Sequence, residues 1–181
     1  MSHVVLDSST LILLAKCTLL KTVCDLFEVI VPEAVNEEVA SEDVAKNYPD
    51  AALILELRKK GAFTVQRLDK GDRFILPLSL HKGEEDALLL AVKLGKPFAT
   101  DDGKAIKAAR FLKVPFIVTP RIVVELYKLD KISFKKARES LEKLGTIGRY
   151  SPEIISDAFV SLMEEKNGKT DDHTNTRGPA E

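Results

Sequence analysis

Histidine and cysteine are scarce in this chain of 181 residues, which contains three histidines and two cysteines. Structural and catalytic zinc sites ordinarily draw on those two residue types, so the sequence offers little from which to build one. Cys17 and Cys24 lie on an apolar background and are expected to be free buried thiols. Aromatic residues make up only 6% of the chain, which argues against the base-stacking platforms of single-strand binding proteins.

A positive charge excess is also missing, because the formal net charge is −1. No global field therefore indicates a nucleic-acid binder, although a local basic face remains compatible with this value. No stretch approaches the roughly 20 apolar residues of a membrane span. The first residues lead directly into an apolar strand pattern, without the basic region and apolar core of a secretion signal. We expect a cytoplasmic protein with no membrane partner.

Apolar residues make up 45% of the chain, enough for the core of one globular domain. Short apolar runs alternate with segments of helical periodicity, which predicts an α/β fold with a parallel sheet covered by helices on both faces. Residues 167–181 contain no large apolar side chain and are expected to form a flexible polar tail after a single domain at 1–166. The predicted strands are 3–6, 28–31, 63–68, 97–100 and 115–118, and the predicted helices are 8–16, 19–27, 33–40, 48–60, 84–94, 104–113, 120–129, 133–144 and 152–165.

Acidic residues recur where the predicted strands end or the following helices begin. They are Asp7, Glu38, Asp86, Asp101 and Asp102. The carboxyl ends of parallel strands share one edge of a sheet, so these side chains are expected to meet in one crevice. Two carboxylates about 4 Å apart repel by ~4 kcal/mol in a partly buried site, and a divalent ion relieves that repulsion. Oxygen-only ligands favour Mg²⁺ or Mn²⁺, which can activate water and clamp a phosphodiester.

Each acidic residue also has a simpler interpretation. Asp86 would complement the dipole of its own helix, Glu38 would be a solvated surface residue, and Asp102 would serve in a turn. The metal interpretation gains its weight from the matching positions of all these residues. Thr10 and Thr100 lie close to the acids in sequence and are candidates for hydrogen bonds to a carboxylate or a phosphate oxygen.

Basic residues recur every three positions on the helix that follows Asp102: Lys104, Lys107, Arg110 and Lys113. Next to a metal site, such a stripe is a candidate guide for an RNA backbone. The alternative is the solvated face of an amphipathic helix.

Four short motifs around the acids resemble those of the PIN-domain family, and within it the VapC-like toxins of bacterial and archaeal toxin–antitoxin pairs. They are residues 4–9 (VVLDSS), 31–39 (VPEAVNEEV), 83–88 (GEEDAL) and 99–102 (ATDD). The resemblance implies a three-layer α/β/α fold with a central parallel sheet of strand order 3-2-1-4-5 and C-terminal helices. It also implies a Mg²⁺- or Mn²⁺-dependent ribonuclease using a metal-activated water, a homodimer and an inhibiting antitoxin partner.

The resemblance assigns roles to the acidic residues one by one. Asp7 and Asp86 become the principal metal ligands, and Glu38 and Asp102 complete the catalytic set. The fourth motif usually has a threonine, one variable residue and then the acid, which favours Asp102 over Asp101. Asp101 remains a further candidate ligand.

Three alternatives to a PIN-domain nuclease can be compared with the sequence, and Ser9 bears on the first of them. Many PIN-domain relatives carry asparagine at this position, so its role here is open. A phosphatase of the haloacid-dehalogenase type would need an acid there, two residues after Asp7, and a phosphoacceptor receiver domain would need the acidic pair after the first strand. The alternative that remains is a non-catalytic module of the same fold that binds RNA or a protein.

Overall fold

The computed structural model describes residues 3–76 and 78–174, with side chains described as far as residue 169. The chain divides into two compact units, Met1–Thr119 and Pro120–Glu181, which are described in turn. The prediction that residues 1–166 form a single domain concerns how these units associate, and it stays a prediction.

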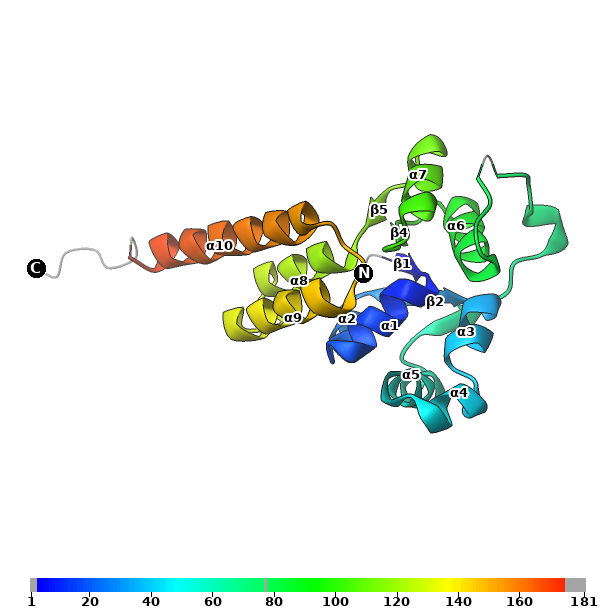
Figure 1. The fold of residues 1–181 in the computed structure, drawn as a ribbon, viewed down its shortest axis with the longest axis horizontal. Coiled ribbons are helices and arrows are strands. Elements are labelled where there is room, and N and C mark those ends of the chain that lie inside the picture. Colours follow the sequence, from blue (N-terminus) through cyan, green and yellow to red (C-terminus); the bar gives the residue numbers. More distant parts are fainter. Residues whose placement is uncertain (1–2, 77, 175–181) are drawn as a thin grey trace, which may run out of the picture. The chain divides into compact units, whose positions relative to one another are not determined.

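A five-stranded sheet forms the centre of the first unit (Figure 1). Its order is β3-β2-β1-β4-β5, and every pairing is parallel. The predicted fold class and strand order are therefore confirmed. The strands are β1 (His3–Leu6), β2 (Glu28–Pro32), β3 (Thr64–Gln66), β4 (Phe98–Ala99) and β5 (Phe116–Ile117).

Helices connect the strands of this unit, as parallel strands require. Helix α4 was not anticipated from the sequence, because it buries none of its residues and so has no apolar stripe. It begins at Ser41, whose hydroxyl accepts a hydrogen bond from the amide of Val44. The helices are α1 (Ser8–Lys16), α2 (Leu20–Leu26), α3 (Glu33–Val39), α4 (Glu42–Asn47), α5 (Pro49–Lys59), α6 (Lys82–Leu94) and α7 (Gly103–Phe111), with a 3₁₀ turn at Lys70–Asp72.

The strand register builds the core on one face of the sheet. Val5 pairs with Ile30 on one side and with Phe98 on the other, so these three buried side chains form a row. Helices α6 and α7 pack onto this row through the buried segment 87–91 and a set of small alanines. Helix α6 ends at Gly95, whose φ of +62° suits a residue without a Cβ atom. The nearly all-apolar middle of α6 is thus explained by burial.

The carboxyl ends of β1 and β4 lie side by side at one edge of the sheet. Leu6, the last residue of β1, pairs with Ala99, the last residue of β4. The next residues along the chain, Asp7 and Thr100, therefore leave the sheet at neighbouring positions, and both are fully buried. This edge is where the acidic residues were expected.

The second unit consists of helices α8 (Thr119–Lys128), α9 (Phe134–Ile147) and α10 (Pro152–Thr174). The ring of Tyr127 meets that of Phe134 edge to face at 5.8 Å, and Lys128 pairs with Glu165 at 3.1 Å. Helix α10 continues to Thr174, so residues 167–174 are helical although the sequence predicted a tail from residue 167. The rest of that tail, 175–181, lies outside the described residues.

Two further expectations concern the whole chain. Neither Cys17 nor Cys24 forms a disulfide among the described residues, and Cys17 is buried as predicted, whereas Cys24 is only partly buried, so the expectation of two buried thiols was wrong for Cys24. In the part of the chain that the structure covers, no helix combines the length and the apolar character needed to cross a bilayer.

Candidate active site

Asp7 joins strand β1 to helix α1 and is held from both sides. Its Oδ1 accepts hydrogen bonds from the amide of Thr10 and the hydroxyl of Ser9, each at 2.8 Å. Its Oδ2 accepts a hydrogen bond from the hydroxyl of Thr100 at 2.5 Å, across the sheet edge. Asp7 therefore caps α1 and links the ends of β1 and β4.

Burial makes Asp7 an unusually weak acid. It raises the pKa of Asp7 from 3.8 to about 6, because a charged carboxylate is poorly solvated in the interior. Hydrogen bonds from Thr10, Thr100 and Ser9 oppose this rise, while the nearby charge of Asp101 adds to it. A carboxylate with this pKa is easily protonated near neutral pH, and a neighbouring cation would favour its charged form.

Asp101 contacts the same two residues at the start of α1, Ser9 and Thr10, that contact Asp7. The backbone amide of Asp101 donates to the hydroxyl of Ser9 at 3.2 Å, and the hydroxyl of Thr10 donates to Asp101 Oδ2 at 3.4 Å. Thr119 adds a bond from its amide to Oδ1 at 2.8 Å and a short bond from its hydroxyl to Oδ2. Ser9, whose role was open, thus bridges Asp7 to the backbone of Asp101.

Glu38 approaches the same helix start from α3. The hydroxyl of Ser8 donates to Glu38 Oε2 at 2.7 Å. A Cβ atom added at Gly83 would lie 2.8 Å from that oxygen and 3.1 Å from the hydroxyl of Ser8. The lack of a side chain at Gly83 therefore allows Glu38 to reach α1 beside the first turn of α6.

Glu84 is a member of this region that was not among the predicted site residues. Burial raises the pKa of Glu84, and the charges of Asp102 and Glu38 raise it further. Glu84, Asp102 and His81 line a cavity of about 150 Å³, and His81 and Glu38 line another of about 490 Å³. The signal for Glu84 was present in the Gly-Glu pair of the third motif.

Asp102 lies next to Asp101 but is oriented toward helix α7. Its Oδ1 accepts hydrogen bonds from the amides of Lys104 and Ala105 at 2.7 and 2.8 Å, so it is the N-cap residue of α7. Its own amide donates to the hydroxyl of Thr100 at 3.2 Å. Asp101 contacts the hydroxyls around Asp7, whereas Asp102 lies nearer to Glu84.

Asp86 is buried on α6 and faces a guanidinium group. Nη1 of Arg73 lies 2.7 Å from Oδ1 of Asp86, and it lies 3.7 Å from an oxygen of Glu85. The contact with Asp86 is an ion pair without hydrogen-bond geometry. Oδ1 of Asp86 therefore has no hydrogen-bond donor among the described residues. The proximity of Asp86 raises the pKa of Arg73 above its ordinary value.

Each carboxylate on its own is a suitable ligand for a hard cation, but the described carboxylates do not together form a complete metal site. Within residues 3–76 and 78–174, no three Asp, Glu, His or Cys side chains are arranged to hold a metal ion. The available side-chain donors are nevertheless oxygens, the type that Mg²⁺ and Mn²⁺ prefer. Oδ1 of Asp86 is a buried oxygen without a hydrogen bond, which suits a metal ligand.

The predicted basic stripe lies on the exposed side of α7. Lys104, Lys107 and Arg110 are all exposed, and the guanidinium of Arg110 lies 5.4 Å from the centre of the Phe116 ring. None of these three forms an ion pair within the part of the chain that the structure describes. Their positive charge is therefore available to a ligand.

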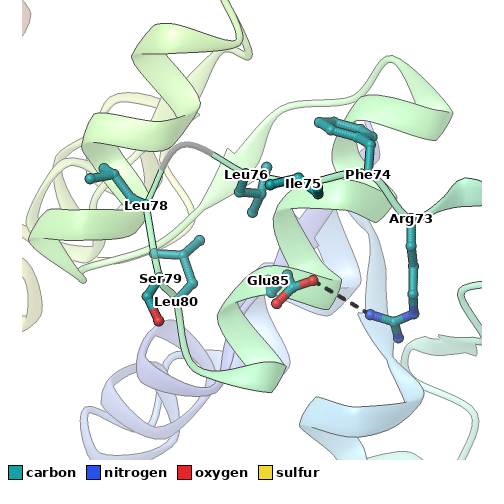
Figure 2. A pocket seen from close by; sticks show the side chains of 8 residues that line it. All are labelled: Arg73, Phe74, Ile75, Leu76, Leu78, Ser79, Leu80 and Glu85. Carbon is teal, nitrogen blue, oxygen red and sulfur yellow. Dashed lines mark ion pairs between the residues drawn. The ribbon is translucent and has the colours of Figure 1, made fainter.

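The segment between the 3₁₀ turn and α6 lines an open cavity of about 490 Å³ (Figure 2). Ile75 is 98% exposed and Phe74 is 43% exposed, whereas Leu76 and Leu80 pack against the core. The ion pair of Arg73 with Glu85, dashed in Figure 2, borders this cavity. We name residues 73–76 and 78–80 the Arg73 segment.

The match to a known family agrees with this description. A sequence model of the PIN domain matches residues 3–165. Among proteins of curated function, none matches the chain. One similar solved structure is a PilT N-terminus domain protein from the hyperthermophilic archaeon Sulfolobus solfataricus. Its TM-score is 0.47 at 14% sequence identity, over 66% of this chain and 88% of that chain.

Proposed function

The chain belongs to the PIN-domain family, and from this premise we propose that it is a metal-dependent ribonuclease that hydrolyses RNA phosphodiester bonds. Its fold is of the nuclease type. The observation that carries the proposal is the start of α1, where Ser8, Ser9 and Thr10 each bond to a carboxylate from a different element. Those carboxylates belong to Glu38, Asp7 and Asp101, respectively.

We assign the metal-ligand roles to the acidic residues at this edge. Asp7 and Asp86 are the proposed principal ligands of Mg²⁺ or Mn²⁺, Glu38 and Asp102 complete the catalytic set, and Asp101 is a further ligand. When bound, the ion supplies a water of lowered pKa and positive charge opposite the phosphodiester. The carboxylates supply its binding energy and limit its positions.

Neighbouring polar residues support these roles. Thr10 and Thr100 fix the orientation of Asp7 through hydrogen bonds, as preorganised ligands require. Lys104, Lys107 and Arg110 are the proposed contacts with the RNA backbone, because they are exposed and begin two residues after Asp102.

A second candidate function is a non-catalytic module that binds RNA or a protein. Two observations favour it: Asp7 is fully buried, and Asp86 is already paired with Arg73. In this alternative the carboxylates serve only to cap helices and to form ion pairs.

Cleavage of RNA with and without a chelator separates the two candidates. We expect cleavage that needs Mg²⁺ or Mn²⁺ and that falls roughly 100-fold in Asp86→Asn, equivalent to about 3 kcal/mol of transition-state stabilisation. Asp43→Asn is the matched control, because its carboxylate is 92% exposed and pairs with Lys46 of the same helix, α4. Mg²⁺ should also raise the melting temperature of the wild-type protein, since it binds the folded form. Binding of RNA without cleavage in the presence of either metal would support the binding module, and cleavage that persists in chelator would contradict metal dependence.

We further propose that this ribonuclease is the toxin of a toxin–antitoxin pair, acting on cytoplasmic RNA as a homodimer. The family resemblance of the four motifs supports this role. Expression of the wild-type chain should arrest growth, and Asp86→Asn should not. Light scattering of the purified chain tests the homodimer, and co-expression with a small neighbouring gene tests the antitoxin.

A further inference from the structure

A cation of the chain itself lies against a buried oxygen of the proposed metal site. The side chain of Asp86 is only 7% exposed, and Nη1 of Arg73 lies 2.7 Å from its Oδ1. Oδ1 lacks a hydrogen-bond donor, so the guanidinium charge is its main compensation. This guanidinium is a positive group on the oxygen that Asp86 would offer to a metal ion.

The turn before Arg73 is anchored to the same helix that carries Asp86. Nζ of Lys93, on α6, lies 2.6 Å from Oδ2 of Asp72 and 3.5 Å from Oδ2 of Asp69. Lys93 and Asp86 are two helical turns apart on α6, about 10 Å along its axis. The 3₁₀ turn is thus held near the C-terminal end of α6 by Lys93. The side chain of Arg73 reaches Asp86 near the N-terminal end of the same helix.

The Arg73 segment is attached weakly enough to be displaced. Arg73 is 36% exposed, so its guanidinium can move into solvent while Asp86 stays buried. Ile75 is almost fully exposed, and Leu76 and Leu80 provide the contacts with the core. Neither helix nor strand is present at residues 73–76 or 78–81. The segment can therefore release Asp86 without unfolding an element of the fold.

Simultaneous binding of Arg73 and a divalent ion to Oδ1 of Asp86 would cost electrostatic free energy. Both are positively charged, and both would lie within a few ångströms of one largely buried oxygen. We propose that Arg73 is a tethered competitor of the metal ion for Asp86, so that the Arg73 segment lowers metal affinity until it is displaced. This inference rests on the proposed function, because it takes Asp86 as a metal ligand.

Removal of the guanidinium charge is the direct test. We would measure Mn²⁺ binding by isothermal titration calorimetry with the full chain, for the wild type, Arg73→Gln and Arg73→Met. Arg73→Met keeps the aliphatic part of the side chain and serves if Arg73→Gln fails to fold. Arg67→Gln is the matched control, since Arg67 is 78% exposed and pairs with Glu33 at 3.8 Å, away from Asp86.

We expect the dissociation constant for Mn²⁺ to fall about tenfold in Arg73→Gln and Arg73→Met, as loss of a competing ion pair at a buried carboxylate predicts. Arg67→Gln should bind as the wild type does. In an Asp86→Asn background, Arg73→Gln should bring no gain, because the contested oxygen is no longer charged.

Each other outcome overturns the inference. Binding that is equal or weaker in the Arg73 variants would mean that Arg73 is a bystander or supports the metal site, while the proposed function would stand. A gain that persists with Asp86→Asn would place the competition elsewhere. If neither the wild type nor any Arg73 variant binds Mn²⁺, both the inference and the proposed metal site fail together.

Discussion

Replacement of Asp7 by asparagine should stabilise the protein at alkaline pH and destabilise it slightly in acid. The rise of the Asp7 pKa from 3.8 to about 6 means that the folded state holds the proton more tightly than the unfolded state. The contribution of Asp7 to stability is therefore largest below about pH 4. It decreases as the pH rises toward 6, where the buried carboxylate ionises, and is constant above.

The size of the effect follows from that pKa. Ionisation of Asp7 in the folded protein costs roughly 3 kcal/mol of unfolding free energy at neutral pH, as an order of magnitude. Asparagine removes this cost and keeps an oxygen for the Thr10 amide and the Ser9 hydroxyl. Its amide group would face the hydroxyl of Thr100, which must turn to accept, at a cost of about 1 kcal/mol. We expect a net gain of about 2 kcal/mol at pH 8 and a loss of about 1 kcal/mol at pH 4.

Urea unfolding in chelator, from pH 4 to pH 8, measures this difference directly. Asp43→Asn is the control, because its carboxylate is 92% exposed and should show little dependence of this kind. Curves for wild type and Asp7→Asn should cross between pH 4 and 6. Parallel curves, or an Asp7→Asn protein that is less stable at pH 8, would refute the argument that burial dominates at Asp7.

Two other substitutions test the geometry around α1. Gly83→Ala should turn Glu38 away and lower metal-dependent RNA cleavage about tenfold, while the unfolding free energy falls by about 1 kcal/mol, because the new methyl group also lies 3.3 Å from the buried Cγ2 of Val35; unchanged cleavage would remove Glu38 from the catalytic set. Asp101→Asn should cost about 1–3 kcal/mol in urea unfolding, because an amide group would face the donors of Thr119. Asp102→Asn is its control, since asparagine caps a helix as well as aspartate does, and equal losses in both would contradict this account.

Local patterns were sufficient to predict much of the fold. The apolar run before Asp7 and the helical periodicity of residues 48–60 each correspond to an observed element, because burial on a sheet or on one helix face leaves a periodic signature. The strand order came from the family resemblance. Helix α4 escaped prediction because it fully buries none of its residues, so its cap at Ser41 was its main local signal.

The detailed contacts of the candidate site could not be predicted in the same way. Ser9 and Gly83 act through residues distant in sequence, and neither spacing nor composition encodes such partners. The pairing of Arg73 with Asp86 depends on the path of an irregular segment, for which periodicity gives no guidance. The identities of the acidic residues were visible in the sequence, whereas the groups that orient or neutralise them appear only in three dimensions.

The contiguity of Ser8, Ser9 and Thr10 has a mechanical consequence. Because these neighbours contact Glu38, Asp7 and Asp101 from a single helical turn, a small rotation of α1 about its axis would shift all three acidic groups in concert. Helix α1 packs against α5 and against α3, which carries Glu38, so a displacement of either helix would be transmitted through α1 to Asp7 and Asp101.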